Sequence, residues 1–273
     1  IFLSPDAAGE VITRLHGQLT RNLGFLYQWY VIALLGFLGF IAFSRHGRIR
    51  LGGQDAKPDY STLSWIGMIF CAGVGATLIY WAVVEWAYYI DAPPLGVAPR
   101  STAAIEWAAT YGIFHWGPIG WAIFCVPTIA IAYAFYQRGE PRLRLSSGCL
   151  PFLPGGPDSA RARVIDFIYM ANLIGGSATA LALTAPMVAA LFEKLTGVPK
   201  SFAVEASIIL ICVLIFAASS FIGLEKGFKR LADANTWIAL GLLGFVTAVG
   251  PTLFILQMGT NSLGLMLQEF VRM

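Results

Sequence analysis

The sequence predicts an all-α membrane protein with six transmembrane helices. Hydrophobic residues make up 57% of its 273 positions and charged residues only 12%, whereas soluble domains carry about 25% charged residues. The apolar residues gather in runs long enough to cross a hydrocarbon core about 30 Å thick. The net charge of +3 is modest and does not indicate a nucleic-acid partner.

The apolar runs divide the chain in order. Residues 1–22 are polar and mildly amphipathic, which predicts a periplasmic or interfacial segment. Residues 260–273 predict an amphipathic helix along the membrane surface. The expected spans between them are residues 23–43, 63–90, 102–136, 164–192, 202–223 and about 231–257.

The third span should be broken at Gly117-Pro118. As one helix, residues 102–136 would be roughly 50 Å long at 1.5 Å per residue, too long for an upright crossing. Proline removes a helical hydrogen bond and clashes with the preceding turn. We therefore expect a kink or an interruption there.

The basic residues predict an orientation. Most lysines and arginines lie in three loops, residues 44–61, 137–163 and 224–231. These are alternate loops, as six crossings require, and the positive-inside rule assigns them to the cytoplasm. We therefore expect the chain to begin and end outside.

The second span, Leu63–Ile90, carries two features that a merely structural span does not need. Gly73 and Gly75 each lower helix stability by about 1 kcal/mol, and Glu85 places a carboxylate at membrane depth, which costs about 2.5–3.5 kcal/mol on insertion scales. We interpret the span as a discontinuous helix that lines a binding cavity. The alternative is a continuous helix packed closely through its small residues.

The stretch FHWGPIGWAIF sets Trp116 and Trp121 around the expected break. Tryptophan faces attract cations, by about 2 kcal/mol or more in a desolvated site. A quaternary ammonium group cannot donate N–H hydrogen bonds, so a box of aromatic faces suits it. An interfacial tryptophan belt is the alternative interpretation.

Several polar residues within the spans have two interpretations each. His115 is either a proton carrier or a satisfied polar residue at a helix junction. Asn172, Ser177 and Thr179 offer oxygens to a hard cation such as Na⁺, or hydrogen bonds between helices. Asn235, at the start of the last span, suits either role.

Enzymatic and metal-binding functions have little support. The sequence has no GxSxG, HExxH or Walker motif and no paired carboxylates, so we expect neither an enzyme nor a cofactor. No cysteines form a CxxC pair, which indicates neither a zinc site nor a disulfide framework. The four cysteines are Cys71, Cys125, Cys149 and Cys212.

Three stretches together carry a family resemblance. They are FCAGVGATLIYWAVVEWAYYIDAPP, FHWGPIGWAIFCVPTIAIAY, and GLEKGFKRLADANTWIAL followed by Gly250-Pro251. In order and spacing they resemble the betaine/carnitine/choline transporters (BCCT), and the resemblance runs from about residue 23 to the end.

The resemblance implies an architecture. Members of this family have twelve membrane helices: two peripheral helices, then two inverted five-helix repeats of the LeuT type. Residues 23–61 resemble the second peripheral helix with its cytoplasmic loop, and residues 62–259 the first repeat. On this view the chain is part of a longer protein, and the second repeat, with its tryptophan-rich helix, is absent from it.

The resemblance also implies a substrate box. The residues similar to the first-repeat part of that box are Tyr88, Trp116, Trp121 and Phe124. The family often has tyrosine where Phe124 stands, so the π face is kept and the hydroxyl is lost. Unwound backbone near Gly73 and Gly75 is expected to meet a substrate carboxylate or an ion.

Candidate Na⁺ ligands follow from the same resemblance. Backbone carbonyls near Cys71 and Val74 match one sodium site of the family. At a second site, where the family has threonines, this chain has Asn172 and Gly176. Exchangers that work without sodium have arginine where Asn235 stands, so the asparagine favours Na⁺ coupling through at least one site.

The expected function is secondary active transport of betaine, choline or carnitine, by Na⁺-coupled symport and alternating access. Two alternatives remain: a Na⁺-independent exchanger, and a non-transporting membrane sensor or channel subunit. The resemblance further implies a multi-pass protein of a bacterial inner membrane, with the lipid bilayer, a small-molecule substrate and two further copies of itself as partners in a homotrimer.

Overall fold

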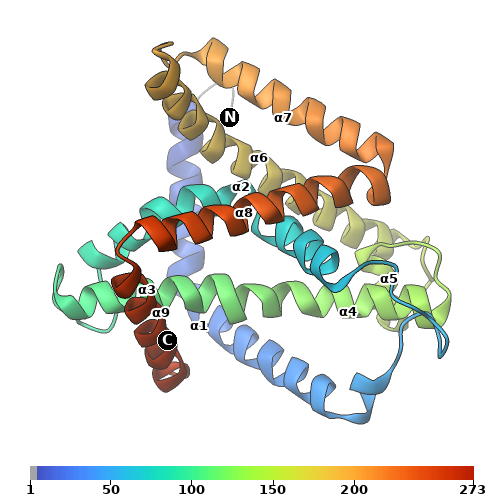
Figure 1. Ribbon diagram of the computed structural model, residues 1–273. Coiled ribbons are helices and arrows are strands. Elements are labelled where there is room, and N and C mark those ends of the chain that lie inside the picture. The colour runs from blue at the N-terminus through green and yellow to red at the C-terminus, as the bar shows by residue number, and fades with distance from the viewer. Residues whose placement is uncertain (1–4) are drawn as a thin grey trace.

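The computed structural model describes residues 5–273, apart from the side chains of residues 5–6, 72–79 and 224–225. Helices make up most of the described chain, which contains no strand. Long helices cross one another at steep angles rather than forming one parallel bundle (Figure 1). The main helices are α1 (Pro5–Phe43), α2 (Thr62–Asp91), α3 (Thr102–Phe114), α4 (Gly120–Arg138), α5 (Leu145–Cys149), α6 (Ala160–Thr196), α7 (Phe202–Ile222), α8 (Lys229–Val249) and α9 (Thr252–Glu269).

Serine caps fix the starts of four helices. In each, the Ser hydroxyl accepts a hydrogen bond from the backbone N–H three residues later, which satisfies one of the unpaired donors of the first turn. These capping residues are Ser61, Ser101, Ser159 and Ser201, before α2, α3, α6 and α7. Glycines with left-handed φ, Gly139 and Gly197, end α4 and α6.

The expected break at Gly117-Pro118 is confirmed. A π-helical turn, η2 (His115–Ile119), separates α3 from α4, and Gly117 inside it has non-helical angles (φ −94°, ψ −109°). Glycine tolerates such angles, and Pro118 removes the hydrogen bond that would otherwise straighten the chain. Because of the break, the side chains of His115 and Trp116 leave the chain in directions that a regular helix would not allow.

Three boundaries differ from expectation. The expected N-terminal segment and first span form one helix, α1, of 39 residues. The last span ends at Val249 rather than near residue 257, because Gly250 is extended (φ −81°, ψ −170°) and Pro251 cannot continue the helix. The surface helix expected at residues 260–273 therefore starts earlier, as α9 at Thr252.

The discontinuity expected at Gly73 and Gly75 is absent. Helix α2 runs without a break from Thr62 to Asp91. Glycine lowers helix propensity without forbidding helical angles. A continuous helix also satisfies its own backbone hydrogen bonds. The side chains of residues 72–79 lie outside the described part.

The helices approach one another through small side chains, as is common in membranes. Gly67 of α2 faces Thr236 of α8 so closely that an added Cβ would lie 2.5 Å from the threonine Oγ1. Helix α9 packs on α3, and α6 packs on both α2 and α7. The fully buried apolar residues are mainly alanines: Ala104, Ala108, Ala122, Ala134, Ala162, Ala185, Ala189 and Ala232.

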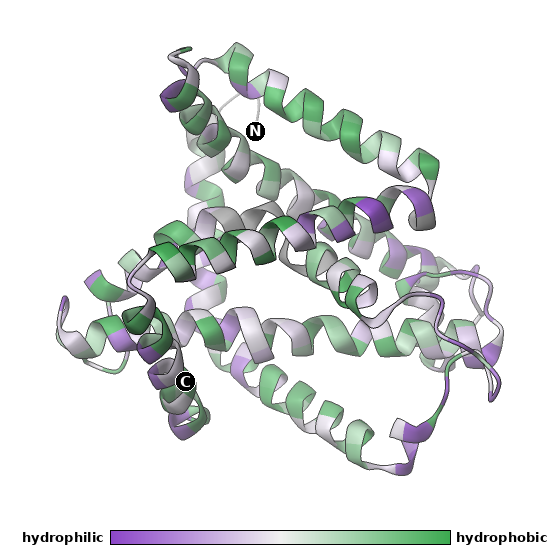
Figure 2. Cartoon of the chain, viewed as in Figure 1, coloured by the Kyte–Doolittle hydropathy of each residue, from purple (hydrophilic) through white to green (hydrophobic). Residues whose placement is uncertain are grey.

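Five apolar helical runs of the described chain are long enough to cross a membrane: Ala7–Phe43, Thr102–Arg138, Ala160–Thr196, Phe202–Ile222 and Lys226–Val249. Helix α2 adds a described apolar part, Thr62–Cys71, that is shorter. Hydrophobic residues dominate the long helices, and hydrophilic ones gather in the loops (Figure 2). The three basic loops lie on one side, at the right of Figure 1, as the predicted alternation requires. These features indicate a multi-pass membrane protein.

Candidate functional site

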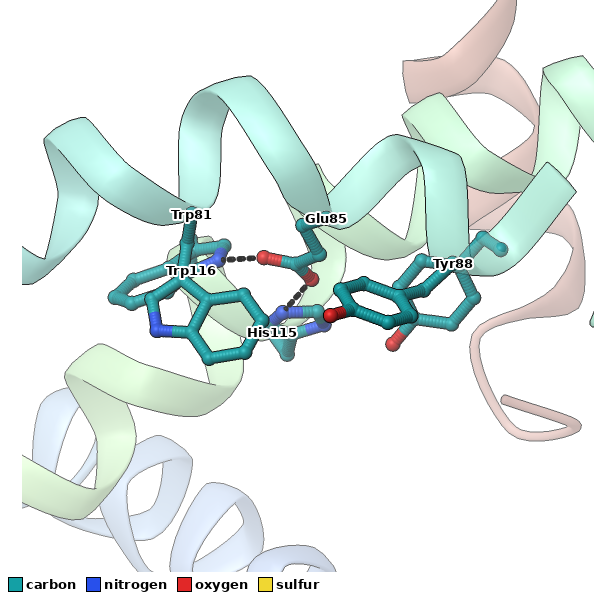
Figure 3. A pocket seen from close by; sticks show the side chains of 6 residues that line it. Trp81, Glu85, Tyr88, His115 and Trp116 are labelled. Atoms are coloured by element: carbon teal, nitrogen blue, oxygen red, sulfur yellow. Dashed lines mark hydrogen bonds and ion pairs between the residues drawn. The ribbon is translucent and has the colours of Figure 1, made fainter. Parts of the chain in front are cut away.

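A cavity of about 360 Å³ lies between the last third of α2 and the η2 turn. Its volume falls within the range typical of small-molecule sites. The cavity is open on one side, and four aromatic rings, one carboxylate and one imidazole line it (Figure 3). The lining residues are Trp81, Glu85, Tyr88, Tyr89, His115 and Trp116.

The spacing of the α2 residues explains why they share one wall. Relative to Trp81, the other three stand four, seven and eight positions later, which places all of them on one face of a helix. They are Glu85, Tyr88 and Tyr89. The opposite wall comes from the broken turn, where His115 and Trp116 are consecutive.

Glu85 joins the two walls. Its Oε2 accepts a hydrogen bond from the Trp116 indole Nε1 at 2.6 Å, and its Oε1 lies 2.5 Å from His115 Nε2. The Glu85 side chain is only 15% exposed, so both carboxylate oxygens would be costly to leave unpaired. Figure 3 shows the carboxylate between the indole and the imidazole. The network therefore satisfies the carboxylate and orients both partners.

Further ring contacts hold the aromatic walls. The rings of Trp81 and Tyr88 lie 6.3 Å apart between centroids. Tyr89 stacks on Tyr111 of α3 at 5.1 Å, with 15° between the ring planes. These distances are typical of favourable aromatic pairs. The cavity thus presents π faces and a carboxylate, groups that suit an organic cation.

Of the four residues expected to form an aromatic box, the structure brings two into this cavity. Tyr88 and Trp116 both line it. Trp121 and Phe124 lie on the first turns of α4 and pair with each other, with ring centroids 6.4 Å apart, outside the cavity lining. Gly73 and Gly75 lie outside the residues whose side-chain surroundings are described.

The candidate sodium ligands are likewise only partly brought together. Asn235 donates a hydrogen bond from Nδ2 to Cys71 Sγ at 3.2 Å, where α2 crosses α8. Asn172 is exposed on a different helix, α6. Val74 lies outside the described side chains. In the described part of the chain, no cluster of three or more His, Cys, Asp or Glu side chains could hold a metal ion.

The binding residues expected from the sequence did not include Trp81, Glu85, Tyr89 or His115. Glu85 and His115 stood out as unusual residues, but nothing in the sequence linked one to the other. The helical spacing of Trp81, Glu85, Tyr88 and Tyr89 was a signal that could have identified the wall. The pairing across to the broken turn required the fold.

Comparison with known proteins supports the family resemblance over the whole chain. A family model described as "BCCT, betaine/carnitine/choline family transporter" matches residues 1–273. The uncharacterized transporter YeaV of Escherichia coli (strain K12) is 38% identical over 244 residues, which are 89% of this chain and 50% of that protein. The chain thus spans about half the length of this curated relative.

Both descriptions are of transporters rather than of enzymes, in agreement with the expectation from the sequence. The family model covers every residue of the chain, and the relative exceeds a third in identity over most of it. The chain therefore belongs to the betaine/carnitine/choline transporter (BCCT) family.

Proposed function

We propose that this chain forms part of a secondary transporter that binds quaternary ammonium compounds such as betaine, choline or carnitine. The observation that carries the proposal is the open cavity lined by four aromatic rings and the Glu85 carboxylate. An onium group offers no N–H donor, so π faces and a negative charge are the groups that can recognise it. The family membership agrees with this substrate class.

The carboxylate suits this task because it is fixed rather than mobile. Two hydrogen-bonding partners, Trp116 and His115, hold it in place. A preorganised charge loses little conformational entropy when a ligand binds. Trp116 then serves twice, since its indole N–H binds Glu85 while its ring contributes a wall to the cavity.

We extend the proposal to the second aromatic pair, Trp121 and Phe124. Both belong to the same broken helical run as Trp116 and lie beyond the π-helical turn. Their rings offer a second binding position for the onium group during alternating access. The fold proposed for the full protein is of the LeuT type, and the membrane is a bacterial inner membrane. The homotrimer expected from the family belongs to the same proposal.

Sodium coupling rests on the contact between Cys71 and Asn235. Helices α2 and α8 meet at this contact, where the side-chain amide of Asn235 binds Cys71. The backbone carbonyl of Cys71 is a proposed Na⁺ ligand. Hard cations prefer oxygen ligands, which backbone carbonyls and an asparagine amide can supply. Asn172, exposed on α6, is the weaker candidate for a second site.

Uptake by the full-length protein in proteoliposomes tests the substrate proposal. Trp81→Ala and Trp116→Ala should each lower the apparent affinity for betaine, choline or carnitine by about ten-fold or more, since a cation–π contact contributes about 2 kcal/mol when desolvated. Trp86→Ala is the matched control, because Trp86 is exposed on the same helix and does not line the cavity. Equal uptake by all three variants would refute the site.

Ion replacement separates symport from exchange. If Na⁺ drives uptake, replacing it by K⁺ should abolish net accumulation, and Asn235→Ala should raise the Na⁺ concentration needed for half-maximal uptake. An exchanger would instead work without Na⁺ when the vesicles are loaded with a counter-substrate. That result would overturn the sodium proposal and leave the onium site standing.

A further inference from the structure

A second cavity, also of about 360 Å³, lies where α1 ends and the loop toward α2 begins. Three arginines contribute to its lining. We propose that it binds the phosphate group of an anionic phospholipid. The residues that line it are Arg45, Arg48, Ile49, Arg50, Gly53, Gln54 and Gln137.

Two hydrogen bonds shape this cavity. Gln137, near the end of α4, donates from its side-chain amide to the backbone carbonyl of Arg50 at 2.5 Å. The guanidinium of Arg50 in turn donates to the carbonyl of Gln54 at 2.9 Å. The first bond fastens the loop to α4, and the second curls it, so that the arginines face a common space.

These arginines differ from those of the neighbouring basic loop. Arg142 pairs with Glu140 at 2.9 Å and with Asp158 at 2.6 Å. Arg144 lies 3.8 Å from Asp166. By contrast, none of the ion pairs in the described part of the chain involves the three arginines of the cavity.

Three cations around one space repel each other unless an anion joins them. Guanidinium groups match phosphate oxygens because each can donate two parallel hydrogen bonds. Gln137 and Gln54 add polar groups to the same lining. The chemistry of the cavity is therefore that of a phosphate site.

The surroundings favour a lipid as the source of the phosphate. Phe43, two residues before Arg45, is 95% exposed, and Phe40, one turn earlier, is 60% exposed. Figure 2 shows the hydrophobic last turns of α1 followed directly by a hydrophilic segment. An anionic lipid has the same order of parts, with acyl chains beside a charged headgroup, and its headgroup attracts basic residues at the membrane edge.

Native mass spectrometry of the full-length protein tests the site, with phosphatidylglycerol and phosphatidylcholine as probes. We expect retained phosphatidylglycerol on the wild type, and roughly ten-fold or greater loss of that binding in the double variant Arg45→Gln/Arg48→Gln. The double variant Arg161→Gln/Arg163→Gln is the control. It removes the same charge from the first turn of α6, outside the cavity.

Competition with inorganic phosphate identifies the source. If millimolar phosphate leaves phosphatidylglycerol bound, the lipid proposal is supported. If phosphate displaces it, or if phosphatidylcholine is retained equally well, the site does not select an anionic lipid and the proposal is overturned. Equal loss in the two double variants would also overturn it. Should Arg45→Gln/Arg48→Gln not fold, the single variants Arg45→Gln and Arg48→Gln carry the same comparison.

Discussion

The indole of Trp116 donates a 2.6 Å hydrogen bond to the carboxylate of Glu85, 31 positions earlier in the chain. This bond, with the neighbouring contact to His115, joins a regular helix to a broken one within a membrane protein. It turns a largely buried carboxylate, costly to leave unpaired, into a fixed group of an aromatic cavity. The charge and the shape of the Glu85 side chain can be tested separately by substitution.

Glu85→Gln keeps the shape and one acceptor for the Trp116 indole but removes the negative charge. We expect the apparent KM for an onium substrate to rise by roughly five-fold or more, since two unit charges about 4 Å apart interact by about 1 kcal/mol even in bulk water. The thermal midpoint should change little. Uptake kinetics and a melting curve on the same preparation check both statements, and an unchanged KM would contradict the role given to the charge.

Glu85→Ala should behave differently, because it leaves the Trp116 N–H and the His115 ring without their partner. An unsatisfied buried polar group costs about 1–3 kcal/mol, and these half-buried groups should cost about 1 kcal/mol, the low end of that range. We therefore expect a clear drop in the melting temperature as well as loss of binding. A melting temperature equal to that of Glu85→Gln would show that the network does not stabilise the fold.

Pro118→Ala tests whether the helix break positions the cavity. Alanine restores the missing N–H and removes the ring clash, which favours a regular helix from α3 into α4. Stability should be equal or higher, while substrate affinity should fall because Trp116 turns away from Glu85. Pro186→Ala, in the last third of α6, is the control, and it should leave affinity unchanged.

Gly67→Ala tests the close crossing of α2 and α8. The new methyl group would lie 2.5 Å from the Oγ1 of Thr236, which itself donates to the Ala232 carbonyl at 2.7 Å. Overpacking of this kind costs about 1–3 kcal/mol. The change Thr236→Ala in the same chain should restore stability, whereas Gly36→Ala, with open space around it, should not destabilise. Melting temperatures of the wild type, the two single glycine variants and the double variant test whether the crossing is this close.

Asp166→Ala should loosen the loop between α4 and α6. Asp166 accepts hydrogen bonds from the backbone N–H of Ser146 at 3.0 Å and from its hydroxyl at 2.8 Å, and Ser146 is buried. Losing the acceptor leaves two buried donors unpaired, at about 1–3 kcal/mol each. Limited proteolysis should cut residues 139–159 faster than in the wild type. Equal cutting rates would show that another contact holds α5.

The helical class and most helix positions could be predicted from the sequence, because hydrophobic runs of this length have few alternatives in a bilayer. Gly117-Pro118 was predictable as a break for the same local reason. The end of α8 was not, since the apolar run continues past Gly250-Pro251 and hydropathy alone does not register the turn. Composition also did not predict that the polar N-terminal segment and the first span form one helix, α1.

The candidate site was predictable in part. Tyr88 and Trp116 followed from aromatic character and family resemblance. The link between Glu85 and His115 did not, because the two residues stand 30 positions apart on different helical segments and only the fold brings them together. Trp121 and Phe124 lie beyond the η2 turn, in α4, where they form a separate aromatic pair.

The length of α1 has a geometric consequence for how the protein stands in its membrane. A helix of 39 residues is about 58 Å long at 1.5 Å per residue, nearly twice the roughly 30 Å of the hydrocarbon layer. To fit inside, it would have to tilt by about 60° from the membrane normal, beyond the roughly 0–40° that membrane helices adopt. Its first half carries Glu10, Arg14, His16 and Arg21. We therefore expect this charged half to lie outside the hydrocarbon layer, while the apolar second half crosses it.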